Sequence, residues 1–224
     1  EGAGGYFTAV SHGAFQLESF GGQDQPFKIT ECSIKRFPLG QYSQTVVQAA
    51  LEVWEQLPDV SDIAEINVST LQTAVNIMAG DPEKWRPANR ETADHSMPYA
   101  AAVALMYGEV GHQHFDDEYL QNQALLDLVA KVKVSVSEEA NRRAPEAMLC
   151  DVEVVTKSGQ RYSSEVDYHK GHYKNPLTDA EVEEKFRSLA NGVIPDARTD
   201  GLLGRLWQLE EVAHVNELIG RART

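Results

Sequence analysis

Cysteine is scarce in this sequence, which holds only Cys32 and Cys150, and neither belongs to a C-x-x-C pair. Two such thiols make no disulfide framework and offer no paired-cysteine metal site. Both lie in or beside β-prone stretches, so we expect them to be buried free thiols. Free thiols fit an intracellular, reducing compartment, either the cytoplasm or, in a eukaryote, the mitochondrial matrix.

Long apolar runs and nucleotide-binding loops are missing as well. No stretch approaches the ~20 apolar residues that span a bilayer, and no secretory signal is visible. There is no G-x-x-x-x-G-K-[ST] loop and no G-x-G-x-x-G after a strand, so nucleotide binding has no local support. A serine hydrolase would need a G-x-S-x-G elbow, which is also lacking.

Positive charge is in short supply. The 224 residues carry 20 Lys and Arg against 34 Asp and Glu, a net charge of −14. A field of that sign repels nucleic acids and anionic membranes, so neither is expected as a partner. A small anionic substrate would therefore require a local cluster of cations.

The densest group of chemically useful side chains lies in residues 90–99, which read RETADHSMPY. An alanine-rich run, residues 100–106, follows at once and predicts a helix that Gly108 ends. Ser96 is the expected N-cap, and Pro98 suits the first turn.

A helix N-terminus carries free N–H groups and partial positive charge, and so favours anions. Arg90, His95 and Tyr99 would lie near this end of the helix. The segment therefore has two interpretations, a polar capping loop or part of an anion-binding site.

A second cationic loop, KRFPLG at residues 35–40, has similar chemistry. It follows a β-prone run, residues 27–34, and precedes a helical pattern over residues 42–57. The arrangement predicts that Lys35 lies at a strand end close to a helix start, with Gln44 in the first turn of that helix.

Taken alone, Lys35 and Arg36 beside a turn are typical of a solvated surface pair. Two such loops in one acidic chain favour a binding site for an anionic substrate. The candidate cations of that site are Lys35, Arg36, Arg90 and His95.

The remaining pattern predicts an α+β fold, in which a small sheet is covered by helices. The expected strands are residues 64–68, 131–136, 151–156 and 160–166, and the last two form a hairpin around the turn at 157–159. The expected helices are residues 69–79, 117–130, 178–190 and 201–218, the third of which starts with a capping box made by Thr178 and Glu181.

Two histidine pairs have spacings that occur in metal sites. They are His112 with His114, and His169 with His172. Neither pair has a convincing third ligand at a fixed offset. We therefore expect solvated loop histidines and no metal.

Several stretches resemble the C-terminal part of the MmgE/PrpD family, which includes 2-methylcitrate dehydratases and cis-aconitate decarboxylases. The matching stretches are EGAGGYF (1–7), KRFPLG with SQT (35–45), GDPEKWRP and RETADHSMPY (80–99), DVEVVTKSGQRYSSEV (151–166) and NPLTDAEVEEKF (175–186). They follow the family's order over nearly the whole chain. The RETADHS-PY form looks most like the 2-methylcitrate dehydratase branch.

The resemblance implies a large helical domain followed by a smaller α+β lid domain, after which the last helices return to the helical body. Residues 1–26 would be the tail of the helical domain, residues 27–172 the lid, and residues 173–224 the returning helices. The chain would then be a fragment or one subunit of a split enzyme, with the N-terminal helical domain as its missing partner. A homodimer is implied for the full-length enzyme.

The family's active site is described as lying between the two domains, without a metal or an iron–sulfur cluster. A lysine in the K-x-F-P loop and a tyrosine in the H-S-x-x-Y segment contribute to it, and these map to Lys35 and Tyr99. Decarboxylases of the family carry a histidine shortly after F-P. Here that stretch reads Leu39-Gly40-Gln41, which argues against the decarboxylase branch.

These implications predict a lyase of propionate metabolism (the methylcitrate cycle), which dehydrates 2-methylcitrate or a similar tricarboxylate to 2-methyl-cis-aconitate without a cofactor. Lys35 and Arg90 would hold carboxylates, and His95 or Tyr99 would transfer the proton. Arg36, Gln44 and Ser96 are further candidate binding residues. Two alternatives stay open: a decarboxylase or epimerase of the same family, and a non-catalytic domain that needs a helical partner chain.

Overall fold

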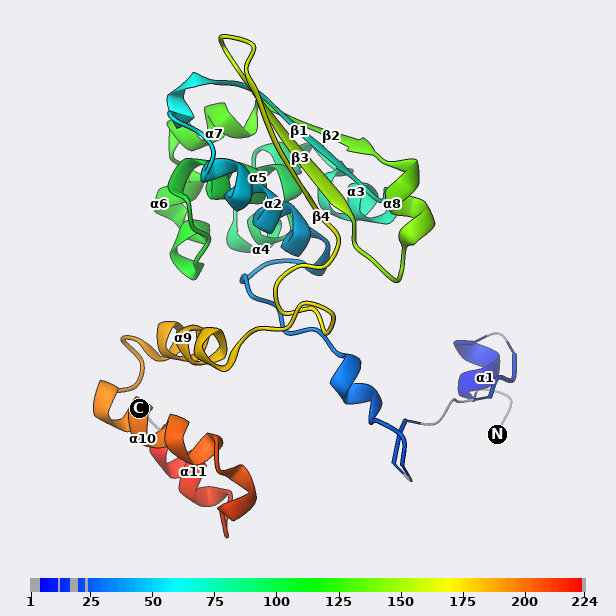
Figure 1. The fold of residues 1–224 in the computed structure, drawn as a ribbon, viewed down its shortest axis with the longest axis vertical. Helices are drawn as coiled ribbons and strands as arrows, with labels where there is room; N and C mark the ends of the chain where they lie inside the picture. The colour runs from blue at the N-terminus through cyan, green and yellow to red at the C-terminus, as the bar shows by residue number, and fades with distance from the viewer. Residues whose placement is uncertain (1–4, 12, 17–19, 23, 223–224) are drawn as a thin grey trace. The chain divides into compact units, whose positions relative to one another are not determined.

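The computed structural model describes residues 5–11, 13–16, 20–22 and 24–222 (Figure 1). They belong to two compact units, Glu1–Ser33 and Ile34–Thr224. The described part of the first unit contains a short helix, α1 (Tyr6–Ala9), and a 3₁₀ turn, η1 (Lys28–Glu31). The EGAGGYF stretch and the expected helical-domain tail fall partly outside the described residues. The domain boundaries after residues 26 and 172 stay predictions.

The expected extended run over residues 27–34 is wrong, because the chain turns through η1 there. A β-prone segment needs a neighbouring strand, and none of the described strands pairs with this one. The prediction that both thiols are buried is therefore half right. Cys32 is exposed, whereas Cys150 is buried within the sheet, and burial raises the pKa of its thiol.

Four strands form one mixed sheet in the order β2-β1-β3-β4, which confirms the α+β prediction. The strands are β1 (Ile63–Thr70), β2 (Val132–Val136), β3 (Cys150–Thr156) and β4 (Arg161–Val166). β1 runs parallel to β2 and antiparallel to β3, and β3 and β4 make the expected hairpin.

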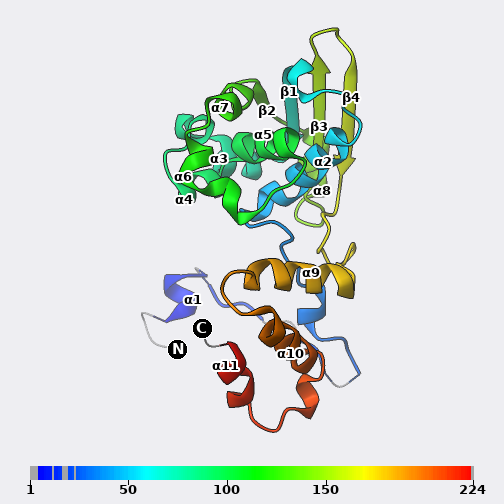
Figure 2. The ribbon, with the colours of Figure 1, turned by 90° about the vertical axis from the view of Figure 1, so that its left-hand side faces the viewer.

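Helices cover one face of this sheet. Along β1, Ile66 and Val68 are buried, whereas Asn67 points to the opposite, partly exposed face. Two helices pack against the buried face, α2 (Gln44–Trp54) and α5 (Met97–Tyr107) (Figure 2). α2 confirms the helix expected over 42–57, although its first turn is a 3₁₀ turn, η2 (Gln41–Ser43).

α5 is the central helix of the second unit. Its residues from Met97 to Leu105 are all buried, as is typical of a helix that is apolar on every side. The expected caps are confirmed. Ser96 Oγ accepts from the Tyr99 N–H at 3.1 Å, and Gly108 ends the helix in the left-handed conformation at φ 68°.

Short helices connect these elements: α3 (Gln72–Ala79), η3 (Val60–Asp62), η4 (Pro82–Trp85), α4 (Arg90–Asp94), η5 (His112–Phe115), α6 (Asp117–Leu120), α7 (Gln123–Val129) and α8 (Glu138–Arg143). The single helix expected over 117–130 is wrong. Asn122 divides it, because its side chain accepts from the backbone N–H groups of Ala124 and Leu125 and so starts a new helix.

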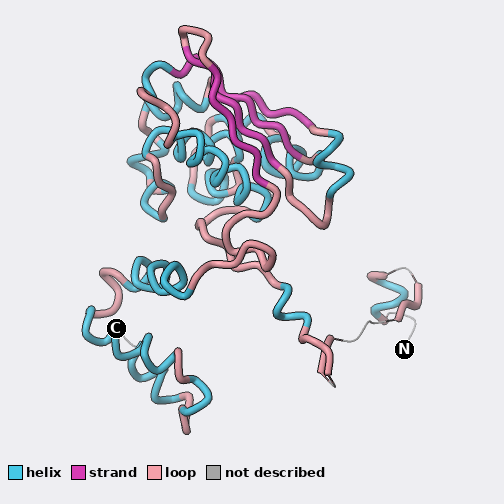
Figure 3. Tube along the Cα trace, viewed as in Figure 1, coloured by secondary structure: helices cyan, strands magenta, loops and turns pink. Residues whose placement is uncertain are grey.

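In the described residues that follow the sheet, the chain forms helices and loops (Figure 3). The capping box is confirmed, and Thr178 and Glu181 start α9 (Asp179–Ala190). The helix expected over 201–218 is wrong. Instead the chain forms α10 (Asp196–Leu206), the 3₁₀ turn η6 (Leu209–Glu211) and α11 (Asn216–Ala222). Leu206, Leu209 and Val212 are three residues apart, which is also the repeat of a 3₁₀ turn. The apolar pattern therefore continues through the break between α10 and η6 and resembles that of a single helix.

None of the described helices is both long enough and apolar enough to cross a membrane.

Replacing Gly108 with alanine tests how the end of α5 is fixed. A Cβ atom there would lie 2.5 Å from the Trp54 ring, whereas at Gly159, which also has a positive φ, nothing lies within 4 Å. We expect Gly159→Ala to lose about 1–2 kcal/mol of unfolding free energy from backbone strain alone. Gly108→Ala should lose clearly more in the same urea titration, and equal losses would contradict the contact with Trp54.

Candidate active site

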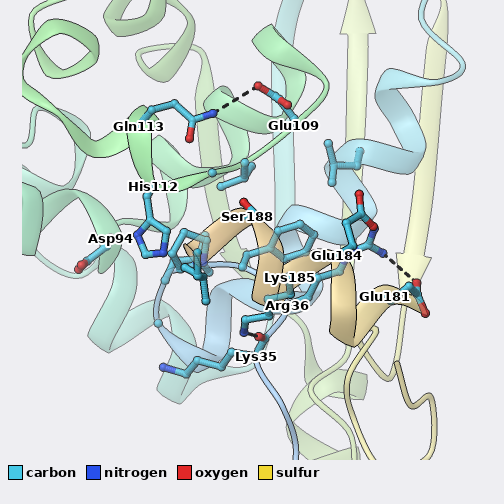
Figure 4. A pocket seen from close by; sticks show the side chains of 18 of the residues that line it. Lys35, Arg36, Asp94, Glu109, His112, Gln113, Glu181, Glu184, Lys185 and Ser188 are labelled. Carbon is cyan, nitrogen blue, oxygen red and sulfur yellow. Dashed lines mark hydrogen bonds and ion pairs between the residues drawn. The ribbon is translucent and has the colours of Figure 1, made fainter. Parts of the chain in front are cut away.

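A cleft of about 810 Å3 lies where four segments of the second unit meet (Figure 4). Its walls come from the KRFPLG loop (35–40), the end of α4 with His95, the loop 108–113 that follows α5, and one side of α9. The two cationic loops identified in the sequence thus line the same cleft.

The KRFPLG loop is held by the side chain of Gln44, which is buried at the start of α2. Gln44 Oε1 accepts from the Phe37 N–H at 3.2 Å, and Nε2 donates to the carbonyls of Phe37 at 3.0 Å and Leu39 at 3.2 Å. The expected substrate contact for Gln44 stays a prediction. In this structure its amide shapes the loop and does not line the cleft.

One backbone hydrogen bond joins the two loops. The Gly40 N–H donates to the Asp94 carbonyl at 2.9 Å, at the end of α4. A Cβ at Gly40 would lie 2.5 Å from Met78 Cε and 3.6 Å from His95 Cδ2. The absence of a side chain here therefore lets the loop pack closely against Met78, beside His95.

His95 lines the cleft, and hydrogen bonds at its Nδ1 fix the orientation of the ring. Its Nδ1 lies 2.5 Å from Asp94 Oδ1 and 3.1 Å from the Glu91 carbonyl. Both partners can only accept, so Nδ1 carries a proton. In the neutral imidazole Nε2 then holds the lone pair, which makes it a candidate proton acceptor.

Arg90 and His112 form the neighbouring wall. Arg90 donates to Asp116 Oδ1 at 3.1 Å, to His112 Nδ1 at 3.0 Å and to the His112 carbonyl at 3.3 Å. Because arginine has no acceptor, His112 Nδ1 accepts and the proton of the neutral ring lies on Nε2. His95 and His112 therefore hold opposite tautomers in one cleft.

Tyr99 does not reach the cleft. It is fully buried, and its hydroxyl donates to the His114 carbonyl at 2.7 Å. Burial is the main cause that raises the pKa of Tyr99, followed by the nearby Tyr107 and Tyr119. Its catalytic role stays a prediction, and what the structure shows is a hydroxyl that fixes the loop 108–113.

Ser96 also lies outside the cleft lining. Its side chain is buried, caps α5 and donates to the Lys84 carbonyl. Its proposed contact with substrate likewise stays a prediction, and in this structure the hydroxyl is used by the backbone.

The expectation of solvated loop histidines is wrong for His114 and His169, which are both buried. His114 Nδ1 accepts from the Gly111 N–H at 2.9 Å, and its ring packs between Tyr107 and Tyr119. Burial lowers the pKa of both histidines. Their hydrogen bonds to backbone and amide groups replace water, which the sequence pattern alone did not indicate.

His169 supports the KRFPLG loop from the other side. Its Nδ1 donates to the Lys170 carbonyl, and its Nε2 lies 2.9 Å from Gln41 Nε2, which donates to it. Neither histidine pair contributes to a group of three metal-ligating atoms among the described residues. Glu91, Asp94 and His95 do bring such atoms within 4.8 Å of one another. The hydrogen bonds of His95 already account for that closeness, so we assign no metal.

α9 closes the cleft on the remaining side. Arg36 lies 3.7 Å from Glu181, and Lys170 lies 3.2 Å from the same carboxylate. Lys185 donates to the Lys35 carbonyl. The sequence analysis missed Lys185 and His112 as cleft residues. Lys185 lies inside the NPLTDAEVEEKF stretch that carries the family resemblance, which was the available signal.

The architecture and cleft define a small α+β domain with a cationic wall and two histidines of opposite tautomer. The MmgE/PrpD C-terminal domain matches residues 37–209, and the chain belongs to the MmgE/PrpD family.

Relatives of two kinds resemble the chain. Human cis-aconitate decarboxylase is 24% identical over 184 residues, which is 81% of this chain and 38% of that protein. The cis-aconitate decarboxylase-like protein oryM of Aspergillus oryzae is 28% identical over 181 residues, 77% of this chain and 36% of that protein. The 2-methylcitrate dehydratase of Salmonella typhimurium is 29% identical over 100 residues, which is 43% of this chain and 20% of that protein. The chain thus spans well under half of these relatives.

Removing the Tyr99 hydroxyl tests its structural role. In Tyr99→Phe the buried His114 carbonyl loses its partner, so we expect a loss of about 1–3 kcal/mol in unfolding free energy. Tyr119→Phe is the matched control, because the Tyr119 ring packs in the same cluster and its hydroxyl bonds no described residue. Equal stability of the two variants in urea would contradict the assignment.

Low pH tests the anchoring of α9. Hydrogen bonds from Thr178 and the ion pair with Lys170 lower the pKa of Glu181 from 4.5 to about 2. A depressed carboxyl pKa stabilises the fold above the unfolded value, and this contribution is lost as pH falls through the folded value. The stability advantage of the wild type over Glu181→Gln should therefore shrink between pH 4.5 and about 2.

Glu184→Gln is the control for that series, since Glu184 lines the same cleft but makes no ion pair with any residue in the described part of the chain. Urea titrations at several pH values measure both differences. A pH-independent gap between wild type and Glu181→Gln would contradict the prediction.

Proposed function

We propose that this chain supplies one wall of the active site of a lyase that dehydrates 2-methylcitrate, or a similar tricarboxylate, to 2-methyl-cis-aconitate. The observation that carries the proposal is the joining of the two cationic loops by the Gly40–Asp94 hydrogen bond around a single cleft. Four lysine and arginine side chains and four carboxylates line this cleft, so in a chain of net charge −14 it is less acidic than the chain as a whole and better suited to an anionic substrate.

The reaction removes a proton from a carbon next to a carboxylate and expels a hydroxyl from the neighbouring carbon as water. Lys35 and Arg90 hold carboxylates, and the positive charge stabilises the electron density that builds up on them as the proton leaves. His95, in its neutral form, accepts the proton at Nε2, and the resulting imidazolium gives a proton to the departing hydroxyl, which leaves as water. The His112 Nε2–H donates a hydrogen bond to the substrate from the neighbouring wall.

Two features support a dehydratase. The RETADHS-PY segment has the form of the 2-methylcitrate dehydratase branch, and position 40 is a glycine that faces Met78 and His95. A larger side chain there requires Met78 to move. The histidine that decarboxylases carry shortly after F-P therefore has no counterpart in this loop.

Decarboxylation of cis-aconitate is the second candidate. It is supported by the similarity to two decarboxylase-type relatives over 184 and 181 residues, and a mitochondrial 2-methylcitrate dehydratase of Yarrowia lipolytica matches over a similar length, 177 residues. The same cations would hold the carboxylates, and the bond that breaks would be carbon–carbon. A third candidate is a non-catalytic domain that becomes part of an active site only with a helical partner chain.

Turnover assays separate these functions. We expect alkene formation from 2-methylcitrate, measured by ultraviolet absorbance, either with this chain alone or after a helical partner chain is added. Carbon dioxide release from cis-aconitate without alkene formation from 2-methylcitrate would select the decarboxylase. Turnover of neither substrate in any combination would overturn the lyase proposal.

Lys35→Ala tests the carboxylate clamp in whichever preparation is active. Loss of a preorganised positive group should lower kcat by about 10²–10³-fold. Lys157→Ala is the control, since Lys157 donates to the Ser61 carbonyl at 2.7 Å, outside the cleft. Wild-type kcat/KM in Lys35→Ala would remove Lys35 from the mechanism.

A further inference from the structure

Two of the four lysine and arginine side chains that line the cleft already have an acidic partner. Arg36 pairs with Glu181, and Arg90 pairs with Asp116. Such pairs cancel much of the charge that an incoming anion would otherwise meet.

Lys35 and Lys185 differ from these residues. Neither ammonium group makes an ion pair with a carboxylate in the described part of the chain, and both side chains line the cleft. They come from different segments, Lys35 from the loop before α2 and Lys185 from α9, and Figure 4 labels both among the side chains that line the cleft.

The two lysines are close enough to affect each other. Lys185 donates to the backbone carbonyl of Lys35. Burial lowers the pKa of Lys185, and the charge of Lys35 lowers it further. The like charge of the exposed Lys35 acts on the partly buried ammonium group of Lys185, and an anion that contacts both would be favoured there.

We propose that Lys185 is a substrate-binding residue, and that with Lys35 it holds two carboxylate groups of a small di- or tricarboxylate. This inference rests on the proposed function, which it deepens by assigning a second carboxylate contact on α9. A ligand with two carboxylates, one on each ammonium group, would offset both charges and tie α9 to the KRFPLG loop. A monocarboxylate can meet only one part of this site.

Citrate is a suitable probe, because it carries the same three carboxylates as 2-methylcitrate and lacks only the methyl group, and acetate is the monocarboxylate comparison. Calorimetric titration of the full chain should show citrate binding and much weaker acetate binding. Lys185→Gln should weaken citrate binding by about tenfold or more, the effect of losing one charge-assisted hydrogen bond. Lys185→Arg keeps the charge and should keep most of the affinity.

Lys131→Gln is the matched control. Lys131 is also partly buried and also donates to a backbone carbonyl, that of Ile63 at 2.6 Å, but it lies outside the cleft. Lys131→Gln removes the same charge from the chain as Lys185→Gln. Because Lys131 lies outside the cleft, the citrate affinity of this variant should equal that of the wild type. Thermal melts of both variants show that each is folded.

The outcomes separate the inference from the proposed function. Absence of citrate binding by the wild type, or equal affinity in Lys185→Gln, would overturn the role of Lys185 even if turnover is observed. Citrate binding that depends on Lys185, in a protein that turns over neither 2-methylcitrate nor cis-aconitate, would support the site and reject the lyase.

Discussion

The site depends on the burial of one amide side chain. Gln44 lies in the core at the start of α2, where an amide without partners would cost stability. The backbone of Phe37 and Leu39 supplies those partners through three hydrogen bonds. The KRFPLG loop is therefore fixed by the requirement to satisfy Gln44, and Lys35 and Arg36 are presented at a defined place without help from a regular strand. The Gly40 N–H then donates to the Asp94 carbonyl and so links the loop to the end of α4.

In the neighbouring wall of the cleft, too, buried side chains position exposed ones. Tyr99 and His114 are themselves inaccessible, yet through the His114 carbonyl and the Gly111 N–H they hold the loop that presents His112. Opposite partners at Nδ1 give His95 and His112 opposite tautomers. The cleft thus combines a proton acceptor, a hydrogen-bond donor and cations within an acidic chain, and the two histidines are oriented by Asp94 and Arg90, which line the same cleft.

The sequence predicted the elements whose signals are local. Alternating strands, the Thr178–Glu181 capping box and the Ser96 and Gly108 caps of α5 were all predicted, since each depends on residues a few positions apart. It failed where distant partners decide. Residues 27–34 are β-prone, but none of the described strands pairs with them. The cap at Asn122 is a local signal that was overlooked, because its side chain bonds backbone N–H groups two and three residues further on. The two loops were recognised separately, but the roles of Gln44, Tyr99 and Ser96 as buried supports, and the approach of Lys185 from α9, required tertiary structure.

The central claim is that two sequence-distant cationic loops and α9 form one binding surface for a small polycarboxylate. Amide chemical-shift mapping of the labelled chain with tricarballylate, an unreactive tricarboxylate, tests it most directly. We predict saturable shifts that converge on Gly40, His95 and Lys185, with little change on the exposed face of the sheet around Asn67. Saturable binding without shifts at these three positions, or shifts that gather on the sheet, would contradict the account.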